Sequence, residues 1–380
     1  MFDGIKLYCP YIEPKQWIFS PLLELPMLVS EKTGEILKQT RVSKYNGLYF
    51  KLIPSKIHNN LIYKEINGSL AKYYNNGKHN NYDYTQSNLK ETIQNLISNF
   101  SLIPEQTEIK RLEFGVNIEL PENITAKKVL KAVISHGNKR FADLNIQNVK
   151  LGRVCSRTDY DIKLYDKGKQ AKTGETNILR VEIKIKRLRS LEPYGIKTLA
   201  DLENKTKTIK LGQLLADRFG ELIFYDNSID KTQLTLHQQI KLLTWVNPMY
   251  WGGLHRNERK RQRQQLNNYM LQFSSSTLQK DIQKLIIKKW YYLHNDQTQK
   301  EYRNTQGNCI RFPQDKKIKL HTFSTVTKYG KCMLFQKQKT NLQTGYKIKK
   351  YYKIRPPPKR NKFLTLANNK ITGKNNIENI

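Results

Sequence analysis

The stretch YDIKLYDKGKQ at residues 160–170 and the stretch ILRVEIK at residues 178–184 decide how the chain folds. In both, polar and apolar side chains alternate strictly, which predicts two strands that each have one buried and one polar face. The polar rows are Asp161, Lys163, Tyr165 and Lys167 in the first strand, and Arg180, Glu182, Lys184 and Lys186 in the second.

These polar rows have the composition of a phosphoryl-transfer site. The hydroxyl of Tyr165 can attack a phosphodiester and form a covalent intermediate if the developing negative charges are stabilised. A lysine such as Lys167 and a divalent metal ion both supply that stabilisation. Because Mg²⁺ and Mn²⁺ prefer carboxylate oxygens, Glu182 is a candidate metal ligand.

A third strand is predicted at residues 111–120, where apolar residues at even positions alternate with mostly polar residues at odd positions. Glu113 lies in its polar row. If the sheet brings these strands together, Glu113 points the same way as Tyr165 and Glu182.

The remaining N-terminal pattern predicts the fold class. Helices are expected at 87–100 and after a capping Thr125, the second with Val129, Leu130, Val133 and Ile134 as its apolar row. Further strands are expected at 1–12, 47–53, 60–66 and 149–154, of which the second and third form a hairpin. This order predicts an α+β protein with an antiparallel sheet, helices on one face and the other face free.

The C-terminal half reads as mostly helical, with apolar residues at helical spacing in 211–219, 234–245, 256–272 and 277–293. We expect a catalytic region at 1–205, a helical DNA-binding region at 206–295, and a polar, basic region at 296–380 that ends in a partly flexible tail. The third helix begins with a basic run that is either a solvated face or a grip on phosphates: Arg256, Arg259, Lys260, Arg261 and Arg263.

The composition favours a polyanionic partner. The 380 residues include 67 Lys and Arg against 32 Asp and Glu, which gives a formal net charge of +35. The abundance of Lys, Asn, Ile and Tyr also fits A/T-rich codons, so charge alone does not identify the partner. The four cysteines lie far apart without metal-binding spacing, which favours a reducing compartment, and no signal or membrane segment is expected.

Three motifs stand in order along the chain: IKRLEF at 109–114, KLYDKG at 163–168 and LRVEIK at 179–184. In this order and spacing, they resemble the motifs of the rolling-circle replication initiators, most closely the filamentous-phage gene II/X family of nicking and joining endonucleases. The resemblance covers residues 1 to about 220 and implies a Rep-like split β-α-β fold.

The resemblance also implies roles for individual residues. Tyr165 would be the nucleophile, assisted by Lys167, and Glu113, Glu182 and Glu65 would hold Mg²⁺ or Mn²⁺. Glutamate at 113 departs from the aspartate that is common there. The family acts on origin duplex and single-stranded DNA in the bacterial cytoplasm, with a host helicase and polymerase. The cations expected to contact DNA on the sheet are Arg111, Arg180, Lys184 and Lys186.

Other interpretations of the same residues stay open. Tyr160 is the rival nucleophile, although period-two alternation places it on the opposite side from Tyr165. Glu113 and Glu182 fit an ion-pair role as well as a metal site. At the level of the whole protein, the alternatives are a DNA-binding protein without catalysis and a module that binds single-stranded RNA.

Overall fold

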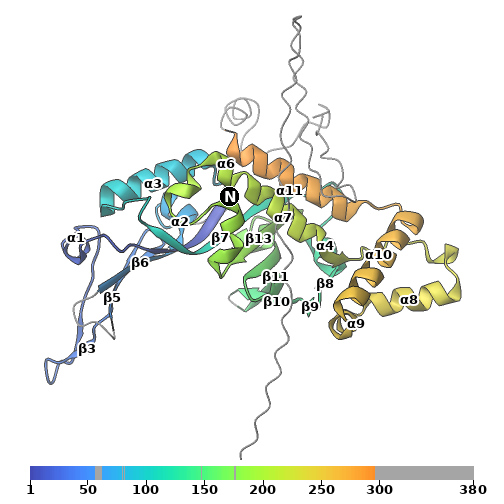
Figure 1. Ribbon diagram of the computed structural model, residues 1–380, viewed down its shortest axis with the longest axis horizontal. Coiled ribbons are helices and arrows are strands. Elements are labelled where there is room, and N and C mark those ends of the chain that lie inside the picture. Colours follow the sequence, from blue (N-terminus) through green and yellow to red (C-terminus); the bar gives the residue numbers. More distant parts are fainter. Residues whose placement is uncertain (56–61, 79, 81, 147, 175–176, 296–380) are drawn as a thin grey trace, which may run out of the picture. The chain divides into compact units, whose positions relative to one another are not determined.

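In the computed structural model, the described residues belong to one compact unit. The structure describes residues 1–295 apart from 56–61, 79, 81, 147 and 175–176 (Figure 1). The expected basic C-terminal region, 296–380, lies outside the described residues. The expected boundary near residue 205 stays a prediction.

Nine strands of the described chain form one sheet, and every neighbouring pair in it is antiparallel. Its order is β10-β11-β12-β13-β7-β1-β6-β5-β4. The strands are β1 (Phe2–Tyr8), β4 (Arg41–Tyr45), β5 (Leu48–Pro54), β6 (Ile62–Ser69), β7 (Glu108–Glu119), β10 (Ala142–Ile146), β11 (Val149–Ser156), β12 (Tyr160–Asp166) and β13 (Ile178–Ile185). The predicted hairpin is the pair β5 and β6.

A layer of helices covers one face of this sheet (Figure 1). It includes α3 (Gln86–Phe100), α4 (Ala126–Ala132), α7 (Lys210–Gly220) and α11 (Leu278–His294). Trp290 of α11 packs edge-on against Phe2 and Phe114, with ring centroids 6.0 and 5.8 Å apart. Gly212 of α7 lies under this tryptophan, where a Cβ would be 2.3 Å from the indole ring, so only glycine allows the approach. The α+β prediction with helices on one face is therefore confirmed.

A second, smaller hydrophobic cluster lies among the helices that follow α7. The indole of Trp245 donates a hydrogen bond to the side chain of Gln262 (2.8 Å), and the indole of Trp251 donates to the Trp245 carbonyl (2.7 Å). The cluster joins α8 (Leu236–Val246), α9 (Pro248–Gly253), α10 (Arg256–Phe273) and a small sheet of β8 (Val133–His136), β9 (Lys139–Arg140) and β14 (Leu222–Phe224). Residues 206–295 thus contribute to two separate cores.

The other described elements are short connections. They are α1 (Pro14–Ile18), β2 (Leu28–Val29), β3 (Ile36–Lys38), α2 (Leu70–Tyr74), α5 (Lys167–Ala171), α6 (Lys205–Thr208) and the 3₁₀ turns Leu188–Ser190, Glu192–Tyr194, Ala200–Leu202 and Lys231–Gln233.

The structure corrects two local predictions. The helix capped by Thr125 ends at Ala132, and Val133 and Ile134 belong to strand β8, in keeping with the strand preference of β-branched residues. Lys167 does not continue strand β12. It is the first residue of α5, whose N-cap Asp166 accepts a hydrogen bond from the backbone of Lys169.

Candidate active site on the open face of the sheet

Three adjacent strands bring the predicted polar rows together on the face without helices. In the register of β12, β13 and β7, Lys163 stands opposite Glu182, which stands opposite Gly115. Two residue pairs along, Tyr165 faces Arg180. We call Glu113, Lys163, Tyr165, Arg180 and Glu182 the strand cluster.

Glu182 lies at the centre of the strand cluster and is 3% exposed. Its Oε1 accepts a hydrogen bond from Lys163 Nζ (2.9 Å), and its Oε2 accepts from Arg180 Nε (3.0 Å) and the Tyr165 hydroxyl (3.3 Å). Burial alone would raise the pKa of Glu182, but Arg180 and Lys163 outweigh it and lower the pKa to about 2. The carboxylate is therefore ionised at neutral pH.

Lys163 links the two carboxylates that were expected to bind a metal. Its Nζ also donates to Glu113 Oε2 at 2.9 Å, while Lys184 pairs with Glu113 Oε1 at 3.1 Å. Burial lowers the pKa of Lys163, but Glu182 and Glu113 raise it more, to about 12. Each of the four carboxylate oxygens thus has a cationic partner.

This donor set does not fit a divalent cation as arranged, because the Lys163 ammonium lies between Glu113 and Glu182. Within the described residues, no three His, Cys, Asp or Glu side chains are grouped to hold a metal ion. Glu65 lies elsewhere: it is on β6, and Lys6 (2.7 Å) and Lys51 (3.7 Å) pair with it. Mg²⁺ or Mn²⁺ binding stays a prediction.

Tyr165 lies in the strand cluster but is only 5% exposed. Burial, more than any neighbouring group, raises the pKa of its phenol, and Arg180 offsets part of that shift. The phenol is therefore protonated at neutral pH, with its proton directed at a carboxylate. Tyr160 is on the helix-covered side, where the Arg218 guanidinium lies 5.0 Å from its ring centroid.

Lys167 reaches the same region from α5 and is buried. Its Nζ donates to the side chains of Gln170 (2.8 Å) and Asn80 (3.3 Å). Burial and the nearby Arg180 lower the pKa of Lys167 to about 8. Its ammonium therefore changes charge near physiological pH.

Sequence reasoning missed Asp3 as a member of this region. Asp3 Oδ2 accepts from Asn80 (2.7 Å) and lies 3.5 Å from Arg180. Its side chain also accepts from Ser69. The only signal was its place in the first strand, because the antiparallel pairing of β1 with β7 could not be read from the sequence.

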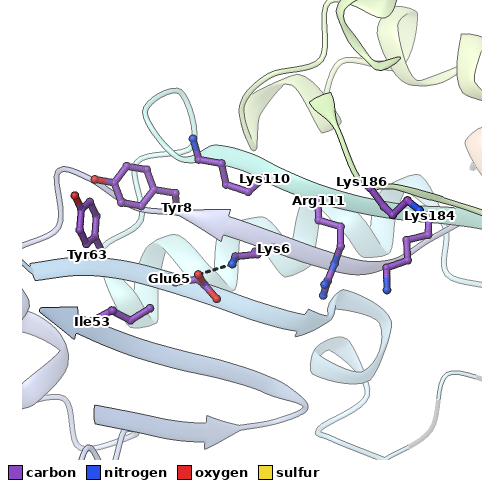
Figure 2. A pocket seen from close by; sticks show the side chains of 9 residues that line it. All are labelled: Lys6, Tyr8, Ile53, Tyr63, Glu65, Lys110, Arg111, Lys184 and Lys186. Atoms are coloured by element: carbon purple, nitrogen blue, oxygen red, sulfur yellow. Dashed lines mark ion pairs between the residues drawn. The ribbon is translucent and has the colours of Figure 1, made fainter. Parts of the chain in front are cut away.

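The predicted DNA-binding cations on the sheet divide between two places. Arg180 is buried in the strand cluster, where it contacts Glu182, Asp3 and Asn117. Arg111, Lys184 and Lys186 instead line an open groove of about 650 Å³, which we call the basic groove. Figure 2 shows its nine lining side chains, which are Lys6, Tyr8, Ile53, Tyr63, Glu65, Lys110, Arg111, Lys184 and Lys186.

The basic run on α10 also divides. Arg259 donates to the carbonyls of Trp251 (3.0 Å) and Leu254, and Arg263 donates to the Gly220 carbonyl, so both stabilise the local fold. Arg261 is exposed and pairs with Glu258. Arg256 and Lys260 are exposed.

Comparison with solved structures finds a weak likeness. No family model and no curated protein matches the chain. The structure of the rolling circle replication initiator protein from Geobacillus stearothermophilus is similar over 66% of this chain and 96% of that chain, at 11% sequence identity and a TM-score of 0.31. At this TM-score the likeness decides nothing about function. Among the described helices, none is long and apolar enough to cross a membrane.

Proposed function

We propose that the protein is a rolling-circle replication initiator that nicks one DNA strand through Tyr165 and later rejoins it. The observation that carries the proposal is the strand cluster, in which three motifs far apart in the sequence meet on adjacent strands of an open sheet face. A phenol, a carboxylate and two cations within hydrogen-bonding distance are the groups that a tyrosine-dependent phosphoryl transfer requires.

In the proposed reaction, Tyr165 Oη attacks the scissile phosphorus while its proton passes to Glu182 Oε2. The bond from phosphorus to the 3′ oxygen breaks, and that oxygen receives the proton from Glu182 through a water molecule, so the carboxylate is restored. The products are a 5′-phosphotyrosine and a free 3′-hydroxyl, which a host polymerase extends as a helicase opens the duplex. Lys163 and Arg180 stabilise the charge on the phosphate.

The test is incubation of the protein with supercoiled DNA of its own replicon and Mg²⁺ or Mn²⁺. We expect open circles with protein that stays attached after boiling, absent for Tyr165→Phe and present for Tyr160→Phe. Adducts with Tyr165→Phe would show that another residue is the nucleophile.

The burial of Tyr165 favours a second candidate, a DNA-binding protein without catalysis. Its phenol is 5% exposed, so a phosphodiester reaches it only if the groups around it rearrange. A protein of this kind would bind DNA tightly, produce no open circles with either metal, and bind equally well with Tyr165→Phe.

A further inference from the structure

The basic groove combines cations with partly exposed aromatic rings. Tyr8 and Tyr63 lie at one end with ring centroids 5.8 Å apart, and Lys184 and Lys186 lie at the other end (Figure 2). Five of the nine lining residues are basic, and Glu65 is the only acidic one. This composition attracts a polyanion and offers flat surfaces on which bases can stack.

A β-bulge builds the middle of the groove. On β7, Arg111 pairs with Lys6 of β1 but Ile109 pairs with Leu7, so Lys110 is an extra residue. Both Lys110 and Arg111 therefore line the groove, although neighbouring strand residues normally face opposite sides. The Lys110 ammonium lies 5.3 Å from the Tyr8 ring centroid.

Arg111 differs from the other groove cations on the sheet. Lys6, Lys184 and Lys186 each pair with a carboxylate, whereas the Arg111 guanidinium donates to the neutral amide of Asn67 (2.6 Å). Among the described residues, no carboxylate pairs with Arg111, and its buried Nε has no hydrogen-bond partner. A partly buried guanidinium that no carboxylate neutralises is suited to a phosphate.

The groove leads to the strand cluster. Lys184, which lines the groove, also pairs with Glu113 of that cluster. In the register of β7, Lys184 is opposite Glu113 and Tyr8 is opposite Glu108, five residues away, which is about 16.5 Å at ~3.3 Å per residue. A few nucleotides span this length.

We propose that the basic groove binds a short single-stranded DNA segment next to the phosphate that is cut. Arg111 and the lysines contact its phosphates, and the rings of Tyr8 and Tyr63 stack on its bases. Paired bases inside a duplex do not expose their faces, so the groove selects single strands. The choice of DNA and the position beside the phosphate that is cut rest on the proposed function.

The experiment measures fluorescence anisotropy of a labelled dT 12-mer, without divalent metal and in a Tyr165→Phe background that prevents cleavage. Tyr63→Ala should weaken binding about tenfold, and Tyr63→Phe should restore it because the ring remains. Tyr291→Ala is the matched control, since Tyr291 is exposed on α11, away from the groove lining. Arg111→Gln should weaken binding and reduce the slope of log affinity against log salt by about 0.7.

Each outcome decides the proposal. Equal affinities for Tyr63→Ala and Tyr291→Ala would overturn it, as would an equal loss of affinity for a duplex of the same length. Tighter binding of an RNA 12-mer would overturn the assignment to DNA. If binding depends on Tyr63 but the protein never nicks DNA, the groove proposal is supported and the proposed function is refuted. If the protein nicks DNA but Tyr63→Ala has no effect on binding, the proposed function is supported and the groove proposal is refuted.

Discussion

The open face of the sheet uses the same residue types in two opposite ways. In the strand cluster, Glu182 is 3% exposed and both of its oxygens are bound by cations. In the basic groove, Glu65 retains 14% side-chain exposure and Tyr63 is 37% exposed. Carboxylates at both ends pair with lysines, but Glu182 and Tyr165 are buried in a fixed network at one end, and the partly exposed Tyr63 leaves a surface for a ligand at the other.

We expect the largest difference between the strand cluster and the basic groove in the free energy of unfolding that is lost when one carboxylate is removed. Glu182→Gln should lower the free energy of unfolding by about 3–5 kcal/mol, because it leaves Arg180 and Lys163 as incompletely paired buried cations. Glu65→Gln, the matched control, should cost about 0–1 kcal/mol. Urea unfolding followed by circular dichroism measures both, and equal losses would show that the two ends do not differ in this respect.

Acid should reveal the same network. Since the pKa of Glu182 in the folded protein is about 2 against an ordinary 4.5, its ionised form stabilises the fold above pH 4.5, and this contribution is lost as the pH falls towards 2. The loss is on the order of 3 kcal/mol. Unfolding free energies measured between pH 6 and 3 should therefore fall more steeply for the wild type than for Glu182→Gln, and parallel curves would contradict this assignment.

Metal binding tests whether Lys163 occupies the position of a cation. Lys163→Met removes the ammonium and leaves Glu113 and Glu182 facing one another, so Mn²⁺ should bind about tenfold more tightly than to the wild type, or about 1.4 kcal/mol. Electron paramagnetic resonance of free Mn²⁺ measures this directly. Lys51→Met beside Glu65 is the control and should change nothing. Equal Mn²⁺ affinity in the wild type and in Lys163→Met would refute the competition between lysine and metal.

The two tyrosines give the smallest difference. Tyr165→Phe removes a buried hydroxyl that donates to Glu182 and should cost about 1 kcal/mol of unfolding free energy. Tyr63→Phe removes a hydroxyl from a side chain that is 37% exposed and should cost less than about 0.5 kcal/mol. Thermal unfolding of the two variants measures both losses. A larger loss for Tyr63→Phe than for Tyr165→Phe would contradict the view that the strand cluster is the fixed network and the basic groove the open surface.

Sequence patterns were sufficient to predict elements that depend on the spacing of residues close together in the chain. The alternation at 160–166 and 178–185 marked both strands, and Thr85 closes a capping box at the start of the helix expected at 87–100. The predicted helix was wrong at Val133, which belongs to strand β8. The predicted strand was wrong at Lys167, which begins α5 after the N-cap Asp166. The position of Glu65 also escaped prediction, because strand order, which separates β6 from β13 by two strands, has no local signature.

Periodicity and composition alone were enough to predict the strands and helices, the α+β class, the polar rows and the basic character of the chain. The three-dimensional arrangement was needed to see that Lys163 lies between Glu113 and Glu182, that Tyr165 is buried, and that a bulge at Lys110 and Arg111 opens a groove beside Tyr63. The physical reason is that pairing, burial and the resulting pKa values depend on which strands become neighbours. That choice is made by long-range packing of the sheet against its helices.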